Sequence, residues 1–205
     1  MKKLKLMTIV GTRPEIIRLS ETIKKCDQYF DHVLVHTGQN WDYTLNQVFF
    51  EDLELREPDY YLDTVGKNLG ETMGNIIAKS YDVIEKEKPD MIIGTGGYVT
   101  APAIIAALQK KIPCMIHESN ALPGKTTMWL SKKVDVIALG FEDAKKRLPK
   151  AKNAVYTGNP TKMSGNVDKQ KIKEQLALNK PLVLVFGGSQ GAKKINETMI
   201  DLIND

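Results

Sequence analysis

The chain has 205 residues, 42% of them hydrophobic and 26% charged, and a formal net charge of +4. These fractions are ordinary for a globular protein that can bury a core, as one large domain or as one domain and part of another. Basic residues are spread along the chain among acidic ones, which does not favour nucleic-acid binding. No apolar run approaches the ~20 residues that a membrane-spanning helix needs. The composition therefore favours a soluble globular protein.

The first residues and the two cysteines favour a cytoplasmic protein. MKKLKLMTIVGTR has a short apolar stretch and no small-residue cleavage pattern, so it is predicted to be a first strand and not a signal peptide. Cys26 and Cys114 lack the spacing of a metal site or a disulfide framework. They are predicted to be inert packing residues in a reducing compartment.

Short apolar runs alternate with helical patterns along most of the chain. The runs cover 4–10, 32–36, 90–94, 113–117, 134–139, 153–158 and 181–188, and helical patterns cover 15–25, 69–86, 101–110 and 125–133. Fully apolar strands alternating with helices indicate a parallel sheet covered on both faces. The fold class is therefore α/β, a doubly wound, Rossmann-like parallel sheet.

The pattern changes near residue 160, where turn-forming residues replace the apolar runs. We expect one Rossmann-like domain over 1–160, then a linker and the start of a second over 161–205. A strand at 182–186, with helices at 169–176 and 192–203, cannot close a parallel-sheet core by itself. This segment either packs onto the first domain or a partner, or opens an incomplete domain. Pairing of its exposed strand with a second chain is one route to a homo-oligomer.

Three glycine-bearing turns follow predicted strands. They are GTRPE at 11–15, GTGGYVTAP at 94–102 and GGSQGA at 187–192. Ligands of doubly wound sheets bind at the carboxyl ends of the strands, where glycine lets a phosphate approach backbone N–H groups. None of the turns is a dinucleotide or Walker A motif, so no cofactor is expected. Each alone could be an ordinary tight turn, but together with HESN at 117–120 they favour a diphosphate-sugar site.

Some side chains near these turns are candidates for binding or chemistry. Arg13 follows a strand, where a guanidinium can bind a phosphate through two parallel hydrogen bonds, or can form a surface ion pair with Glu15. His117 and Glu118 leave a strand together and are the candidate acid/base pair. Alternatively, His117 donates to a backbone carbonyl. His32 and His36 have no further ligand nearby in the sequence, so no metal site is expected.

Residues 1–90 resemble the non-hydrolysing UDP-N-acetylglucosamine 2-epimerases, particularly the capsule and N-acetylfucosamine branch. The matching stretches are VGTRPEIIRLS, HTGQNWDYTLNQVFFEDL and the helix ending EKEKPD. The resemblance implies that Gly11, Arg13 and Arg18 lie at a nucleotide diphosphate.

From residue 91 onward the chain resembles the MurG family of peptidoglycan N-acetylglucosaminyltransferases. The matching stretches are GTGGYVTAPAIIAA, IPCMIHESNALPGKTTMWLS, GFEDAKKRLP, TGNPTK and VLVFGGSQGAKKIN. Both families have the GT-B plan, in which two Rossmann-like domains hold a UDP-sugar, so the chain is interpreted as a chimera joined near 89–94. The resemblance implies substrate-binding positions at Gly96, Gly97, Tyr98, Glu118, Asn120, Lys162, Ser189 and Gln190.

The departures from both families bear on catalysis. An epimerase of this kind should have an aspartate in a GDT-like motif where residues 94–97 read GTGG. The transferase should begin with a GGTGGH-like loop where residues 11–15 read GTRPE. Lys162 occupies the position of an arginine in the transferases. It keeps the positive charge but cannot form the two parallel hydrogen bonds of a guanidinium. We therefore expect both catalytic sets to be incomplete.

Three functions remain open. The first is a GT-B protein of glycosyltransferase lineage, which transfers N-acetylglucosamine to a lipid-linked muramyl acceptor and is catalytically impaired here. The second is UDP-N-acetylglucosamine 2-epimerase activity, and the third is an engineered folding or modularity protein without activity. The related transferases are peripheral to the inner membrane face. Membrane association is not expected here, because residues 69–88 read as an ordinary amphipathic helix with one buried stripe.

Overall fold

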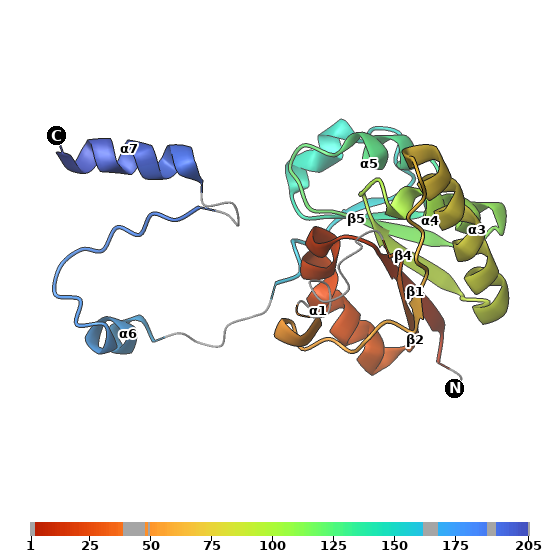
Figure 1. Ribbon diagram of the computed structural model, residues 1–205, viewed down its shortest axis with the longest axis horizontal. Helices are drawn as coiled ribbons and strands as arrows, with labels where there is room; N and C mark the ends of the chain where they lie inside the picture. Colours follow the sequence, from red (N-terminus) through yellow and green to blue (C-terminus); the bar gives the residue numbers. More distant parts are fainter. Residues whose placement is uncertain (1–2, 39–47, 49, 162–167, 188–191, 205) are drawn as a thin grey trace. The chain divides into compact units, whose positions relative to one another are not determined.

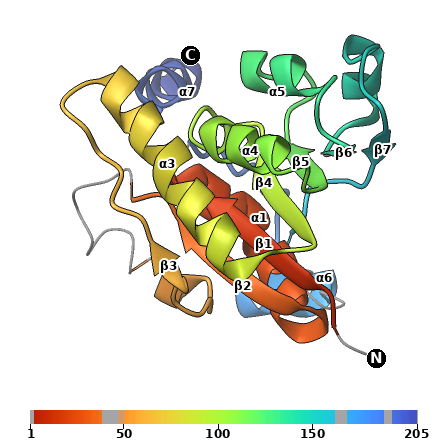
Figure 2. The ribbon, with the colours of Figure 1, turned by 90° about the vertical axis from the view of Figure 1, so that its right-hand side faces the viewer.

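A computed structural model describes residues 3–38, 48, 50–161, 168–187 and 192–204. Within these residues seven parallel strands form one sheet in the order β3-β2-β1-β4-β5-β6-β7 (Figures 1 and 2). The strands are β1 (Lys5–Val10), β2 (Asp31–His36), β3 (Tyr60–Tyr61), β4 (Met91–Thr95), β5 (Cys114–Glu118), β6 (Val136–Leu139) and β7 (Ala154–Tyr156). The doubly wound α/β fold predicted from the apolar runs is confirmed.

The strand order of the sheet reverses between β1 and β4, which are neighbours in the sheet but not consecutive in the chain. Strands β2 and β3 extend the sheet on one side of β1, and the chain then returns to place β4 on the other side. Leu6 accordingly pairs with His32 of β2 and with Met91 of β4. In open α/β sheets such a reversal leaves a crevice at the carboxyl ends of the two strands, where ligands bind.

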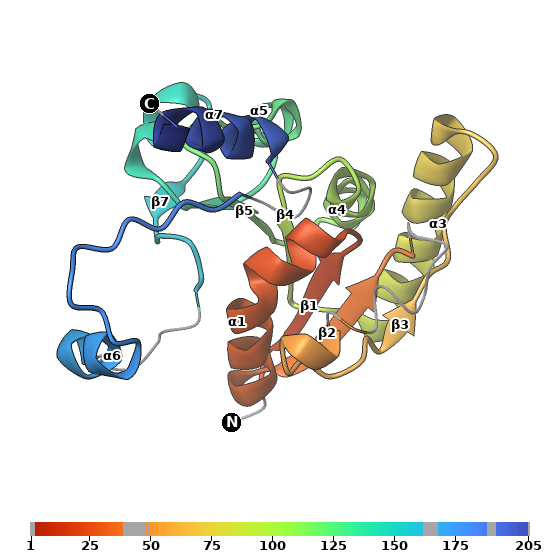
Figure 3. The ribbon, with the colours of Figure 1, turned by 60° about the vertical axis from the view of Figure 1, so that its left-hand side comes forward.

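Helices cover the two faces of the sheet unequally. They are α1 (Arg13–Tyr29), α3 (Leu69–Glu87), α4 (Thr100–Gln109), α5 (Lys125–Leu130) and the 3-10 helix η1 (Glu142–Arg147). Figures 2 and 3 show α1 on one face, beside β1 and β2, and α3 and α4 together on the other. Side chains of β1 alternate accordingly, because Met7 and Ile9 join the large cluster with α3 and α4, whereas Val10 packs with α1. Burial of each such side chain contributes about 1.5–3 kcal/mol.

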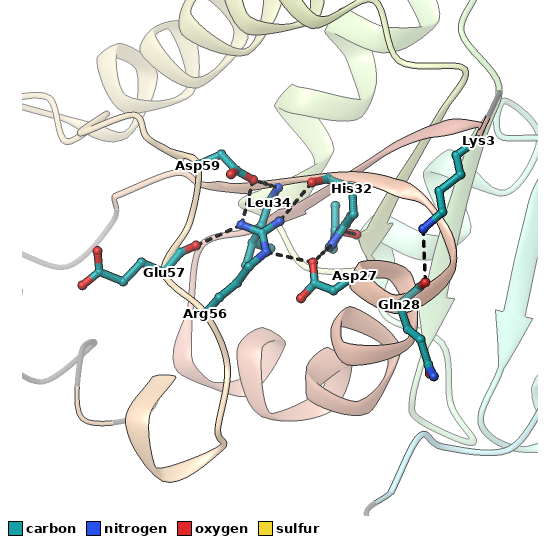
Figure 4. A network of polar contacts seen from close by, with 9 residues as sticks. Lys3, Asp27, Gln28, His32, Leu34, Arg56, Glu57 and Asp59 are labelled. Carbon is teal, nitrogen blue, oxygen red and sulfur yellow. Dashed lines mark hydrogen bonds and ion pairs between the residues drawn. The ribbon is translucent and has the colours of Figure 1, made fainter.

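A polar network lies at the amino ends of the strands (Figure 4). Arg56 Nε donates to Asp27 Oδ1 at 2.8 Å, and its guanidinium also pairs with Asp59 at 2.9 Å. His32 contacts the same Asp27 oxygen at 2.6 Å, and Asp59 accepts from the Leu34 N–H at 2.7 Å. These four charged or titratable residues, Asp27, His32, Arg56 and Asp59, are the amino-end network. It ties the end of α1 to β2 and to the segment before β3.

By its internal contacts the chain divides into two compact units, Met1–Lys162 and Met163–Asp205. The second contains α6 (Lys169–Gln175) and α7 (Lys193–Asn204). The strand predicted at 182–186 is wrong within the described residues, because 181–187 form no strand. Val183 and Phe186 are 81% and 78% exposed. An apolar run becomes a strand only where another strand pairs with it, and the described part of this unit offers none.

Candidate functional site

Three loops meet at the carboxyl edge of the sheet, where the reversal between β1 and β4 places the expected crevice. They follow β1, β4 and β5 and cover 11–12, 96–99 and 119–124. We call them the carboxyl-edge loops. Two buried glutamates, each only 3% exposed, hold these loops in place.

Glu15 joins the loop after β1 to β4 and to the start of α4. Its Oε2 accepts from the backbone N–H groups of Gly11 at 2.9 Å and Thr12 at 3.0 Å. Its Oε1 accepts from the hydroxyls of Thr95 at 2.6 Å and Thr100 at 3.0 Å. Glu15 is therefore an internal acceptor and not the surface partner that the sequence offered for Arg13.

Glu118 is the buried acceptor of the loop after β5. Its Oε1 accepts from the backbone and side-chain N–H groups of Asn120, at 2.9 and 2.8 Å. Its Oε2 accepts from the Gly124 N–H at 3.0 Å and the Thr127 hydroxyl at 2.6 Å. All four donors lie within nine residues of Glu118, so this carboxylate shapes the loop and the start of α5.

Gly96 and Gly97 lie between the two carboxylates. A Cβ added to Gly97 would be 2.2 Å from Glu15 Oε1. A Cβ added to Gly96 would be 1.9 Å from the Thr127 hydroxyl and 3.2 Å from Glu118 Oε2. A larger side chain at either position would displace these buried groups, so packing alone is sufficient to explain both glycines.

These hydrogen bonds determine which groups the edge presents to a ligand. The N–H groups of Gly11 and Thr12, which the glycine turn would offer to a phosphate, donate to Glu15. The side chains of Arg13, Tyr98 and Asn120 are exposed. An arriving anion would therefore meet side chains, foremost the Arg13 guanidinium, and not the backbone N–H groups of the first loop.

His117 is buried and faces a cavity of about 320 Å³ that Thr22, Thr157 and Gly158 also line. Among the described residues neither of its ring nitrogens has a hydrogen-bond partner. Burial lowers the pKa of His117. The Gly158 backbone and Glu118 oppose that shift, and the charge of Arg18 adds to it. The backbone-carbonyl partner considered from the sequence does not reach hydrogen-bond geometry.

The structure does not bring His117 and Glu118 together as an acid/base pair. Consecutive residues of a strand face opposite sides of the sheet. His117 accordingly faces the cavity beside Leu19 and Thr22 of α1, whereas Glu118 contacts Thr127 of α5. The two side chains therefore act in different surroundings.

The remaining predicted positions lie in different places. Arg18 is exposed on α1, whereas Lys162, Ser189 and Gln190 lie outside the described residues.

His36 is a buried histidine at the end of β2. Burial lowers its pKa to about 4, its Nδ1 accepts from the Gly38 N–H, and its ring stacks on Tyr61. The described ranges contain no group of three or more His, Cys, Asp or Glu that could hold a metal ion. No described helix is long and apolar enough to cross a membrane.

Sequence reasoning missed Glu15 as the organiser of the first loop. A signal for it was present, because Thr12 and Glu15 have the T-x-x-E spacing of a capping box, in which the glutamate accepts from the backbone N–H of the N-cap residue, here Thr12. The partners Thr95 and Thr100 are 80 and 85 residues away and carry no such local signal.

The fold defines a class, namely a Rossmann-like α/β domain of the GT-B type. Within that class, the family model for UDP-N-acetylglucosamine 2-epimerase matches residues 23–119. A solved 2-epimerase from Rickettsia bellii is 37% identical with a TM-score of 0.65, covering 74% of this chain and 44% of that one. The Methanocaldococcus jannaschii epimerase in complex with UDP-GlcNAc and UDP is 28% identical with a TM-score of 0.66, covering 72% and 43%.

The second similarity is to a transferase family. The UDP-N-acetylglucosamine–N-acetylmuramyl-(pentapeptide) pyrophosphoryl-undecaprenol N-acetylglucosamine transferase of Caldanaerobacter subterraneus is 48% identical over 124 residues, which are 59% of this chain and 34% of that one. The Ruminiclostridium cellulolyticum transferase is 43% identical over 126 residues, 60% and 35%. Acinetobacter baumannii MurG is 25% identical with a TM-score of 0.69, covering 95% and 55%. The match spans about a third of these curated relatives, and the chain is similar to both GT-B lineages.

Proposed function

We propose that this chain binds a UDP-N-acetylglucosamine-type nucleotide sugar at the carboxyl-edge loops. The observation that carries the proposal is the placement of exposed Arg13, Tyr98 and Asn120 around loops that Glu15 and Glu118 hold in place. The crevice between β1 and β4 is where such sheets bind ligands. Relatives of both lineages carry this nucleotide sugar in their names or are solved with it.

Arg13 has the largest part in this proposal. Its guanidinium can hold a diphosphate through two parallel charge-assisted hydrogen bonds, next to the start of α1. Among the described residues of the first unit, Arg18, Gly96 and Gly97 complete the proposed binding set, and Lys162, Ser189 and Gln190 remain positions implied by the family resemblance.

The lineage we propose is that of the transferases, as a chimera with an epimerase-like first part. Inverting transfer needs a base for the acceptor hydroxyl and donors for the departing diphosphate. His117 is the remaining candidate base, because Glu118 already accepts from four donors in its own loop and the start of α5. We therefore propose impaired transfer to a lipid-linked muramyl acceptor. An epimerase-type activity is the second candidate, favoured by the family model over 23–119.

Activity assays separate these candidates. UDP release from UDP-N-acetylglucosamine, measured with and without a lipid-linked acceptor, reports transfer, and formation of the 2-epimer reports epimerisation. We expect both rates to be at least a thousandfold below typical enzyme rates of roughly 10 per second. Full turnover in either assay would contradict the proposed impairment, whereas an engineered or otherwise inert protein would give none.

Binding tests the proposed role of Arg13 separately from turnover. Arg13→Ala is expected to weaken UDP about tenfold in calorimetric titration, because it removes the bidentate contact. Arg13→Lys, which keeps the charge without the fork, should fall between wild type and Arg13→Ala. The control Lys3→Ala changes a cation at the other end of β1 and should leave the affinity unchanged. Equal affinities of all four proteins would rule out the role of Arg13.

For the second unit we propose self-association through the apolar segment 182–186, in a cytoplasmic protein. Val183 and Phe186 are exposed there, and an exposed apolar segment of high β-propensity pairs readily with another chain. Light scattering should give the mass of a dimer, which the substitution Val183→Lys should reduce to that of a monomer. A monomeric wild type would contradict this proposal.

A further inference from the structure

We propose that Glu15 is a built-in anion, a positioning residue whose carboxylate fills the donor cluster that a phosphate would otherwise occupy and thereby fastens the loop after β1 to β4. This goes beyond nucleotide-sugar binding, because it concerns how the carboxyl edge is assembled whether or not a ligand is present.

The donors around Glu15 form a small anion cradle. Two of them are consecutive backbone N–H groups, those of Gly11 and Thr12, beside the N-terminus of the 17-residue helix α1. The other two are hydroxyls, those of Thr95 and Thr100. All four contacts are 2.6–3.0 Å long and all four donors are uncharged. Amides and hydroxyls converging at a helix start are the arrangement that binds phosphate in other sheets of this kind.

The contacts of Glu15 join segments that are far apart in the sequence. Gly11 and Thr12 follow β1, whereas Thr95 ends β4 and Thr100 begins α4. Thr95 extends the connection, because its hydroxyl accepts from the Gly97 N–H at 3.1 Å while donating to Glu15. One carboxylate thus fixes two loops of the carboxyl edge that lie far apart in the sequence.

Substitutions of Glu15 distinguish a hydrogen-bond acceptor from a side chain that contributes by packing alone. Glu15→Ala leaves four buried donors without an acceptor, and the melting temperature should fall by about 10 °C. Formate at about 0.1 M fits the vacated space and should restore about 3–5 °C of that loss, whereas chloride at equal ionic strength and the bulkier pivalate should not. Glu15→Gln keeps the shape but loses the negative charge. Its carbonyl oxygen can accept from the two backbone N–H groups, but its N–H₂ then faces the two hydroxyls, which can no longer donate to it, so this variant should lose about 5 °C and gain nothing from formate.

Glu21→Ala is the matched control on the same helix. Glu21 pairs with Lys24 at the surface, so its loss should change the melting temperature by less than about 2 °C, with no effect of formate. The proposal is overturned if the melting temperature of Glu15→Gln equals that of the wild type. It is also overturned if formate raises the melting temperature of Glu15→Ala no more than that of Glu21→Ala.

A double-mutant cycle keeps the proposal testable if Glu15→Ala does not fold. Thr100→Val should lower the melting temperature of the wild type by about 3 °C, but that of Glu15→Gln by less than 1 °C, because the Thr100 hydroxyl no longer donates to a carboxylate in that variant. Additive effects would contradict the coupling. Titration with UDP is a separate measurement. If the wild type does not bind UDP, the proposed function is refuted, but the result for Glu15 still stands.

Discussion

The two ends of the sheet satisfy their carboxylates in different ways. At the carboxyl edge, Glu15 and Glu118 are buried and accept from backbone N–H groups, hydroxyls and one carboxamide. At the amino end, Asp27 and Asp59 are 28% and 41% exposed in their side chains and pair with Arg56. Uncharged donors satisfy the carboxylates at the carboxyl edge, where the Arg13 side chain is exposed, whereas the amino end uses the cation Arg56 to hold the fold together.

The largest effect is expected from Glu118. Glu118→Ala removes the acceptor of four donors, and the free energy of unfolding should fall by about 3–4 kcal/mol in urea titrations. Glu142→Ala, at the exposed start of η1, should change it by less than about 0.5 kcal/mol. A loss below 1 kcal/mol for Glu118→Ala would mean that the buried carboxylate does not organise its loop.

The pH dependence of stability should come mainly from His36, at the carboxyl end of β2. Burial alone lowers its pKa to about 4, from an unfolded value near 6.5, so the unfolded state binds the proton more tightly between these values. The stability is therefore complete above pH 6.5 and lost as pH falls toward 4, by up to about 3 kcal/mol.

His36→Gln should flatten this pH profile, as measured by urea titration at pH 7 and pH 4.5. His32, at the amino end, is the matched histidine, because burial also lowers its pKa but Asp27 opposes the shift. His32→Gln should therefore flatten the profile less than His36→Gln. The reverse order would contradict the assignment.

The smallest effect is expected at the amino-end network. Arg56→Ala should destabilise the protein by about 1–2 kcal/mol, because its partners are partly exposed. That loss should shrink in about 0.5 M salt, which screens exposed charges, whereas the loss in Glu118→Ala should not. If salt reduced the loss of stability equally in both variants, the proposed difference between the two ends of the sheet would be wrong.

The sequence predicted the sheet better than the site. Apolar runs placed the ends of β1, β2 and β4–β7 within two residues, because buried parallel strands are apolar throughout. The run at 182–186 failed because apolarity does not supply a pairing strand. Strand alternation could have separated His117 from Glu118, since the period of two was readable in advance. The bonds from Glu15 to Thr95 and Thr100 could not be predicted, because they depend on the pairing of β1 with β4.

The central claim is that a nucleotide sugar binds at the carboxyl edge through side chains around loops fixed from within. Backbone amide NMR of the ¹⁵N-labelled chain during titration with UDP-N-acetylglucosamine tests it most directly. We expect shifts at Arg13, Tyr98 and Asn120, and none at Lys5 or Asp59 at the amino end. Shifts confined to the amino end, or no shifts at about 1 mM ligand, would contradict the claim.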